Sequence, residues 1–175
     1  MKIASPKSKA TRRIKHVVLL TALVAVPLAL QPFEDFRDNH AFLLNASPSL
    51  PNWAFWLDKR APIKRGGLIF FEPKKSKILT SHFGSKPQLF GKYVLGLPGD
   101  RVAHEGQDVL INGKIIAQTK TKTRLGLPLS KGPSGEIPHG CYYAGSPHKD
   151  GFDSRYADIG FVCGPQILGS GRAIL

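Results

Sequence analysis

The sequence predicts a mostly β domain that follows a single apolar N-terminal helix. The chain has 175 residues, including 18 glycines and 14 prolines. The apolar runs after residue 40 are short and are separated by turn residues, a pattern typical of antiparallel strands rather than long helices. One longer apolar run stands near the N-terminus. The length allows one domain with a hydrophobic core.

Residues 1–33 combine a basic leader with an apolar segment. The leader, residues 1–16, carries seven basic side chains and no acidic one, and VVLLTALVAVPLAL follows at residues 17–30. Flanking residues up to Phe33 extend this run toward the roughly 20 residues that a membrane-spanning helix needs. We therefore expect a transmembrane anchor or signal segment at residues 17–33, and we favour an uncleaved anchor.

Two alternatives to an anchor remain open. A cleavable signal peptide needs small residues at the first and third positions before the cut, and the nearest candidate, Leu23-Val24-Ala25, begins with a bulky leucine. A buried core helix is less consistent with so basic a flank and so little amphipathic spacing. With an anchor, the leader stays in the cytoplasm, and a juxtamembrane linker (34–40) and the domain (41–175) lie across the membrane.

The formal charge of +13 does not by itself indicate nucleic acid. Six of the basic residues in the leader are Lys or Arg, so the exported part retains only +7. Its basic clusters, DKRAPIKRGG and EPKKSKIL, are typical of solvated loops that can face anionic lipid. A DNA-associated factor thereby loses most of its support, and we expect inner-membrane lipid but no nucleic acid as a partner.

Several short segments are predicted to be strands. Asn112-Gly113 in DVLINGKIIAQ is a strong signal for a two-residue hairpin turn between two strands. The other predicted strands are GGLIFFEP, KYVLGL, GCYYAG, IGFVCG and GRAIL.

The two cysteines and the six histidines carry less information. In an exported domain, Cys141 and Cys163 are a candidate disulfide, with two buried free thiols as the alternative. The histidines show no ligand spacing, so we expect no metal and no cofactor.

Three candidate functional segments are ambiguous when each is taken alone. Lys92, just before GLPGD, could be a surface lysine, and Ser49 in SPSLP could be a turn serine. Asp153-Ser154-Arg155 could be a surface turn with a weak ion pair.

Together, four segments resemble the conserved boxes of type I signal peptidases. In order, they are NASPSLP, which assigns the nucleophile to Ser49, RGGLIFFEP, KYVLGLPGD with Lys92, and IPHGCYYAGSPHKDGFDSRYADIGFV with Asp153. They cover most of residues 45–174. The resemblance implies a signal-peptidase-like β-fold of short, coiled antiparallel strands and a Ser/Lys dyad.

The spacing between the candidate site residues narrows this resemblance to a smaller group of signal peptidases. Only 43 residues separate Ser49 from Lys92 and 61 separate Lys92 from Asp153, which leaves little room for the second domain of general-purpose bacterial signal peptidases. The small size, the single anchor and Asn45 shortly before SLP are similar to the TraF-type peptidases of conjugative transfer, which mature pilin subunits.

The chemistry explains why a lysine and a serine are paired. A solvated lysine has a pKa of about 10.4 and is protonated at neutral pH, whereas burial in apolar surroundings favours the neutral amine. Ser49 would then attack the scissile carbonyl while Lys92 accepts and later returns the proton. The resemblance places the oxyanion hole at the Ser49 N–H and the Ser47 hydroxyl.

The resemblance also implies supporting residues and one departure. Asp153, Ser154 and Arg155 are expected to support the lysine strand and the serine loop. Family members often have a serine two residues before the aspartate, where its hydroxyl orients the lysine. Here that position is Gly151, so Ser154 or another group would take over.

The sequence therefore predicts a membrane-anchored serine endopeptidase of the bacterial inner membrane, with its domain in the periplasm. Its substrates would be exported precursors, either pilins or proteins with signal peptides, cut after small residues by hydrolysis or by cyclising transfer. A catalytically inactive component of a pilus or secretion apparatus is the alternative that Gly151 motivates. A triad of Ser134 with His139 or His148 lacks a nucleophile elbow.

Overall fold

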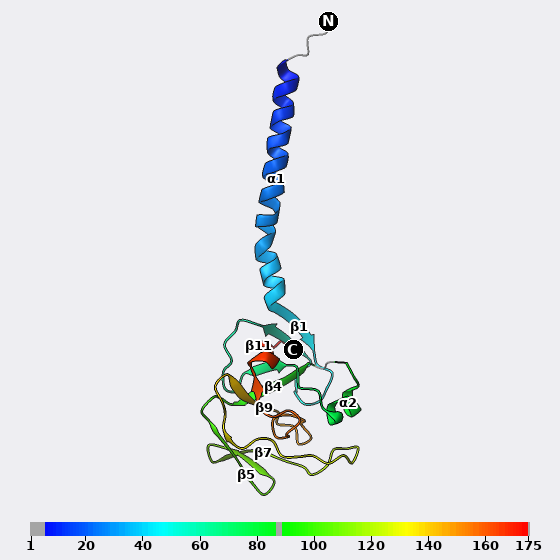
Figure 1. Ribbon diagram of the computed structural model, residues 1–175, viewed down its shortest axis with the longest axis vertical. Coiled ribbons are helices and arrows are strands. Elements are labelled where there is room, and N and C mark those ends of the chain that lie inside the picture. The colour runs from blue at the N-terminus through cyan, green and yellow to red at the C-terminus, as the bar shows by residue number, and fades with distance from the viewer. Residues whose placement is uncertain (1–5, 87–88, 175) are drawn as a thin grey trace. The chain divides into compact units, whose positions relative to one another are not determined.

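The chain divides after Asn39 into two units, an N-terminal helix and a β-rich domain (Figure 1). The computed structural model describes residues 6–86 and 89–174. The first five residues of the predicted basic leader therefore lie outside the described residues.

The first unit is helix α1, Pro6–Asn39. Its part Val18–Asn39 is long and apolar enough to cross a membrane, and those of its large apolar side chains that the structure describes are exposed. The predicted apolar N-terminal helix is confirmed. The residues expected as a linker are helical up to Asn39, because neither glycine nor proline interrupts residues 33–39. At this end, the Asn39 side-chain amide donates to the Asp35 carbonyl at 2.6 Å.

The second unit contains two antiparallel sheets, as the mostly β prediction requires. The larger has seven strands in the order β1-β2-β11-β3-β4-β9-β10. Their bounds are His40–Leu44 (β1), Ala54–Asp58 (β2), Leu68–Phe71 (β3), Phe90–Gly96 (β4), Cys141–Gly145 (β9), Val162–Cys163 (β10) and Ile167–Ala173 (β11).

The smaller sheet has four strands in the order β7-β6-β5-β8. Their bounds are Arg101–Glu105 (β5), Asp108–Ile111 (β6), Lys114–Gln118 (β7) and Gly135–Glu136 (β8). The predicted hairpin turn lies between β6 and β7, where Asn112 has a φ of 51° and Gly113 a φ of 78°. Two successive positive φ values match the twist of the flanking strands.

One segment expected to be a solvated loop is partly helical. Residues Lys77–Phe83 form helix α2, and a single 3₁₀ turn, Gly164–Gln166, precedes β11. Ser76 caps α2, since its hydroxyl accepts from the Leu79 N–H at 3.1 Å, and Leu79 is buried in the core. Seven residues are too few for a clear helical period, which is why the sequence pattern missed this helix.

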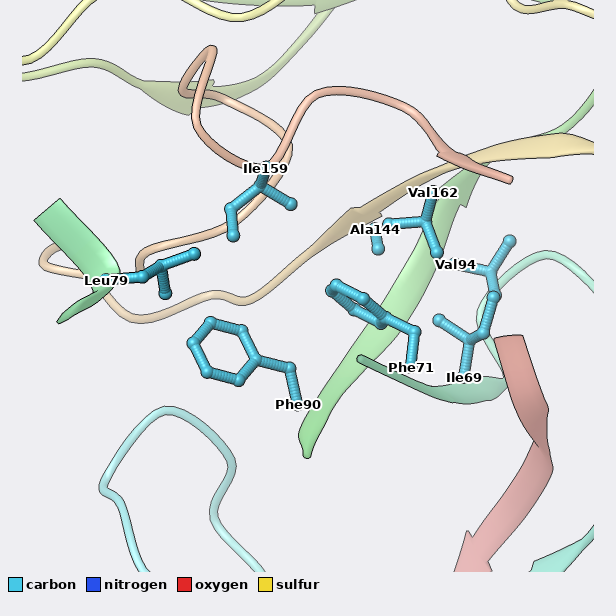
Figure 2. Close-up of a cluster of buried hydrophobic side chains, with 8 residues drawn as sticks. All are labelled: Ile69, Phe71, Leu79, Phe90, Val94, Ala144, Ile159 and Val162. Carbon is cyan, nitrogen blue, oxygen red and sulfur yellow. The ribbon is translucent and has the colours of Figure 1, made fainter. Parts of the chain in front are cut away.

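Strand β4 separates two apolar clusters because its side chains alternate between the two faces of the sheet. Phe90 and Val94 point into a cluster with Ile69 and Phe71 of β3 (Figure 2). Residues 91, 93 and 95 are only partly buried. Lys92 has the same parity as Phe90 and Val94, so this lysine points into the apolar cluster.

A disulfide between Cys141 and Cys163 joins β9 to β10, where the two residues are paired in register. The bond closes a segment with a sequence separation of 22 residues. We predict that reduction lowers the free energy of unfolding by about 3 kcal/mol, because the reduced unfolded chain gains conformational freedom. Urea unfolding with and without dithiothreitol measures this change.

A C141S/C163S double variant is the control for reduction. It should show the stability of the reduced protein in either buffer. Equal unfolding midpoints for the oxidised and the reduced wild type would contradict the prediction.

Candidate active site

Ser49 lies in the turn between β1 and β2, and Asn45 organises this loop. The Asn45 side-chain amide donates to the carbonyls of Leu50 at 3.0 Å and Asn52 at 2.7 Å, while its oxygen accepts from the Ser47 N–H at 3.0 Å. One side chain thus connects both ends of the turn. The sequence showed this asparagine near the serine but not its structural reason.

The two serines of the loop face each other. Their hydroxyl oxygens, Ser47 Oγ and Ser49 Oγ, are 2.9 Å apart and share a hydrogen bond. Pro48 between them has no N–H, and within the described residues no hydrogen bond occupies the Ser49 N–H. A hydroxyl and a free backbone N–H are therefore available beside the Ser49 oxygen.

Leu50 brings this loop against β4. Its side chain is 5% exposed and packs in a cluster with Phe70. A Cβ at Gly91 would lie 2.8 Å from Phe70 and 3.4 Å from Leu50, so the glycine provides room for this approach. Ser49 directly precedes Leu50 in the chain, and Lys92 directly follows Gly91.

Lys92 is buried in apolar surroundings on β4. It lies opposite Ile69 of β3, is 5% exposed, and has its amine 5.6 Å from the centroid of the Phe90 ring. Burial lowers the pKa of this amine to about 8, with Asp153 opposing the shift and Arg155 adding to it. At pH 7 roughly one amine in ten is then neutral, against fewer than about one in a thousand at the ordinary pKa.

Asp153 and Arg155 form a buried ion pair. The Arg155 guanidinium donates from Nε to Oδ1 of Asp153 at 2.8 Å and from Nη2 to Oδ2 at 3.0 Å. The Arg155 side chain is 3% exposed and the Asp153 side chain is 0% exposed, and both act electrostatically on Lys92. Arg155 also donates to the Gln118 carbonyl at 3.2 Å, which ties the pair to β7. A bidentate pair of this kind holds both side chains in one geometry.

Ser154 attaches this segment to β9. Its hydroxyl accepts from the Ala144 N–H at 3.0 Å, and its own N–H donates to the Ala144 carbonyl at 2.9 Å. Both contacts are to the backbone of the strand. Ser154 thus fixes the segment of Asp153 and Arg155 against β9, and its hydroxyl is bound to the backbone of that strand.

Within the described residues, no hydrogen bond joins the Lys92 amine to the Ser49 hydroxyl, whose partner is Ser47. Catalytic hydrogen bonds are commonly long or poorly aligned until a substrate is bound. In the same part of the chain, no group of three His, Cys, Asp or Glu side chains could hold a metal ion.

The long apolar N-terminal helix and the antiparallel sheets are the features expected of a peptidase attached to a membrane through its N-terminus. The family described as "Signal peptidase, peptidase S26" matches residues 11–175. The chain therefore belongs to the peptidase S26 family and is a serine endopeptidase of the signal peptidase I type, which processes precursor proteins with signal peptides. No match to the chain was found among curated proteins.

Replacing Lys92 by methionine is expected to stabilise the folded domain at pH 7. The pKa of the amine is 10.5 unfolded and about 8 folded, so the unfolded state binds more protons between these values and wild-type stability rises with pH there. Methionine has no charge to desolvate. The expected gain at pH 7 is about 3 kcal/mol and shrinks toward pH 10. Urea unfolding across this range measures it.

Lys114→Met is the control for this measurement, because Lys114 is an exposed lysine of β7. It should change stability little at any pH. A Lys92→Met domain that is no more stable than wild type at pH 7 would show that burial of the amine costs nothing.

Proposed function

We propose that Ser49 and Lys92 are the catalytic dyad of this peptidase and that the chain matures pilin subunits in conjugative transfer. The observation that carries the dyad is the Lys92 amine. It is buried in apolar surroundings, has a lowered pKa, and stands on the strand against which the Ser49 loop packs. A neutral amine in this place is the base that a serine nucleophile requires.

In the proposed reaction, Ser49 Oγ attacks the scissile carbonyl while Lys92 Nζ accepts its proton. The negative charge that develops on the carbonyl oxygen is stabilised by the Ser49 N–H and the Ser47 hydroxyl. Lys92 then returns the proton to the leaving amine, and a second nucleophile releases the acyl group from Ser49. Lys92 thus acts first as a base and then as an acid.

The edge of the larger sheet supports a binding mode for the substrate. Among the strands of the described residues, β1 pairs with β2 alone, and its last residue precedes the serine loop directly. An extended precursor segment can add to this edge by main-chain hydrogen bonds, which would align its scissile bond with Ser49. Shallow pockets beside such a strand would favour small residues before the cut.

The small size of the domain and the structure of the serine loop support a role like that of the TraF-type peptidases of conjugative transfer, which we call the conjugation branch. Four short strands make up the smaller sheet, and the chain between β4 and Asp153 adds no further domain. Asn45, which organises the loop of Ser49, is the asparagine that the TraF-type resemblance pointed out. In this setting the anchor holds the domain on the periplasmic face of the inner membrane. The second nucleophile is then water or an amine of the pilin itself, which would give a cyclic product.

We predict that Ser49→Ala and Lys92→Ala each abolish maturation of a pilin precursor. The loss should be roughly a thousandfold or more, because a dyad works as a unit and neither member is effective alone. Full-length variants, each co-expressed with the pilin precursor, are compared by mass spectrometry of the pilin. The mass also separates a linear from a cyclic product.

Ser134→Ala is the matched control and should process the precursor normally. If both dyad variants still yield mature pilin, the dyad is wrong and an inactive anchored component becomes the better account. If the wild type processes a precursor with a signal peptide but not the pilin, the peptidase stands and the conjugation branch fails.

The rate should also depend on the charge of Lys92. Since only the neutral amine accepts the proton, kcat/KM should rise with pH up to a plateau, with an apparent pKa near 8 in the free enzyme. The initial rate of precursor cleavage between pH 6 and pH 10 measures this profile. A rate that is already maximal at pH 6 would exclude Lys92 as the base.

A further inference from the structure

We propose that Ser146 is a positioning residue of the reaction and that its hydroxyl orients the Lys92 amine toward Ser49. This inference rests on the proposed Ser49 and Lys92 dyad. It concerns a residue that the sequence motifs did not single out, since Ser146 lies in GSPHKDGF, the part of the last box that departs most from the family pattern.

The register of two strands places Ser146 across from Lys92. Strands β4 and β9 pair Val94 with Ala144 and Tyr93 with Gly145. One further step in this antiparallel register sets Lys92 opposite Ser146, directly after the end of β9. Side chains at opposite positions of such a pair point to the same face, with Cβ atoms about 5 Å apart. The flexible stem of lysine allows the amine to reach a hydroxyl at this position.

Ser146 is held firmly by the Asp153 and Arg155 ion pair. Its N–H donates to Asp153 Oδ2 at 3.0 Å, its hydroxyl donates to the same oxygen at 3.3 Å, and its carbonyl accepts from Arg155 Nη2 at 2.8 Å. The residue is 3% exposed. A serine fixed at its N–H, its side chain and its carbonyl presents its hydroxyl in a defined direction.

The hydroxyl also occupies the space beside Gly151. A Cβ at position 151 would lie 2.3 Å from Ser146 Oγ, 2.9 Å from Asp153 Oδ2 and 3.1 Å from Arg155 Nη2. A side chain at position 151 would therefore force the Ser146 hydroxyl to move from its present place. The absence of a serine at position 151 is thus explained by a hydroxyl that reaches the same place from another residue.

The hydrogen-bonding capacity of a hydroxyl suits this assignment. Ser146 donates its one proton to Asp153, which leaves its lone pairs to accept an N–H of Lys92. When one N–H of the neutral amine is held in this way, its lone pair is directed rather than free to rotate. The Lys92 amine can then accept the Ser49 proton without first having to rotate into the right orientation.

The test compares Ser146→Ala with wild type in the full chain in detergent micelles. The substrate is an internally quenched peptide with alanine at the first and third positions before the scissile bond. We expect kcat to fall roughly ten- to a hundredfold, with KM within about twofold, because the base is misplaced while the binding edge is unchanged. The double variant S146A/G151S, which returns a hydroxyl to the vacated space, should recover part of kcat.

Ser170→Ala is the matched control. Like Ser146, Ser170 is a buried serine whose hydroxyl donates a hydrogen bond. Its acceptor is the Leu68 carbonyl at 3.1 Å, and it lies on β11. It should leave kcat and KM unchanged. Comparable thermal unfolding midpoints for the two alanine variants separate loss of orientation from loss of fold.

A second readout does not depend on turnover. The titration of Lys92, followed by NMR of ¹³C-labelled lysine, should shift to lower pH in Ser146→Ala but not in Ser170→Ala. The ammonium loses an acceptor that favours its charged form. Ser146→Ala with the kcat and the Lys92 titration of Ser170→Ala would overturn the inference.

The two readouts also distinguish this inference from the proposed function. If wild type does not cleave any precursor but the Lys92 titration still shifts in Ser146→Ala, the proposed function of the dyad fails and the contact between Ser146 and Lys92 stands. If wild type cleaves in a Ser49-dependent way and Ser146→Ala is normal in both readouts, only the positioning role fails.

Discussion

A lysine can serve as a base near neutral pH only when its amine is kept away from water, and this requirement governs the structure around Lys92. The residue has the same strand parity as Phe90 and Val94, whose side chains lie in a cluster of aromatic and aliphatic residues (Figure 2). Its amine is 5.6 Å from the centroid of the Phe90 ring. The same surroundings destabilise the ammonium and therefore the folded domain. Such a loss of folding stability is typical of functional sites, where an ionisable group is buried in surroundings that disfavour its charged form.

The buried charges near Lys92 have to be balanced for the same reason. Asp153 alone would attract the ammonium and raise its pKa, which would work against a neutral base. Arg155 binds Asp153 in a bidentate geometry and counters this attraction. Because its two charges offset each other, the ion pair brings a carboxylate close to the Lys92 amine without holding that amine in its protonated form. The Ser154 hydroxyl accepts from the backbone of β9, and the Ser146 N–H donates to Asp153, so this unit is held against β9.

Most strands could be predicted from the sequence because glycine, proline and Asn-Gly punctuation marks the ends of short apolar runs. Asn112-Gly113 specified its hairpin because few residues tolerate two positive φ values in succession. Strands β1 and β2 were not singled out, because their five-residue sequences HAFLL and AFWLD show no alternation of apolar and polar residues. Helix α2 depends on a single cap and on Leu79 packing in the core, and neither leaves a periodic pattern.

The candidate site was only partly accessible to sequence reasoning. Ser49, Lys92 and Asp153 stand in recognisable motifs, and the structure buries two of them as the proposed chemistry needs. Asn45 and Ser146 act through contacts with residues that their own sequence neighbourhoods do not reveal. Asn45 bridges to backbone carbonyls across its loop, and Ser146 depends on the strand register between β4 and β9. Gly151 signalled a missing hydroxyl, but only the packing around it showed which residue fills that space.

The distance between Lys92 Nζ and Ser49 Oγ in an experimental structure of the enzyme with a peptide boronate on Ser49 tests the central claim most directly. Such an adduct mimics the tetrahedral species that the dyad would stabilise. The account predicts that the amine lies about 3 Å from the serine oxygen, with no other basic side chain at that position. An amine too far away for even one bridging water, or another base on the serine oxygen, would contradict it.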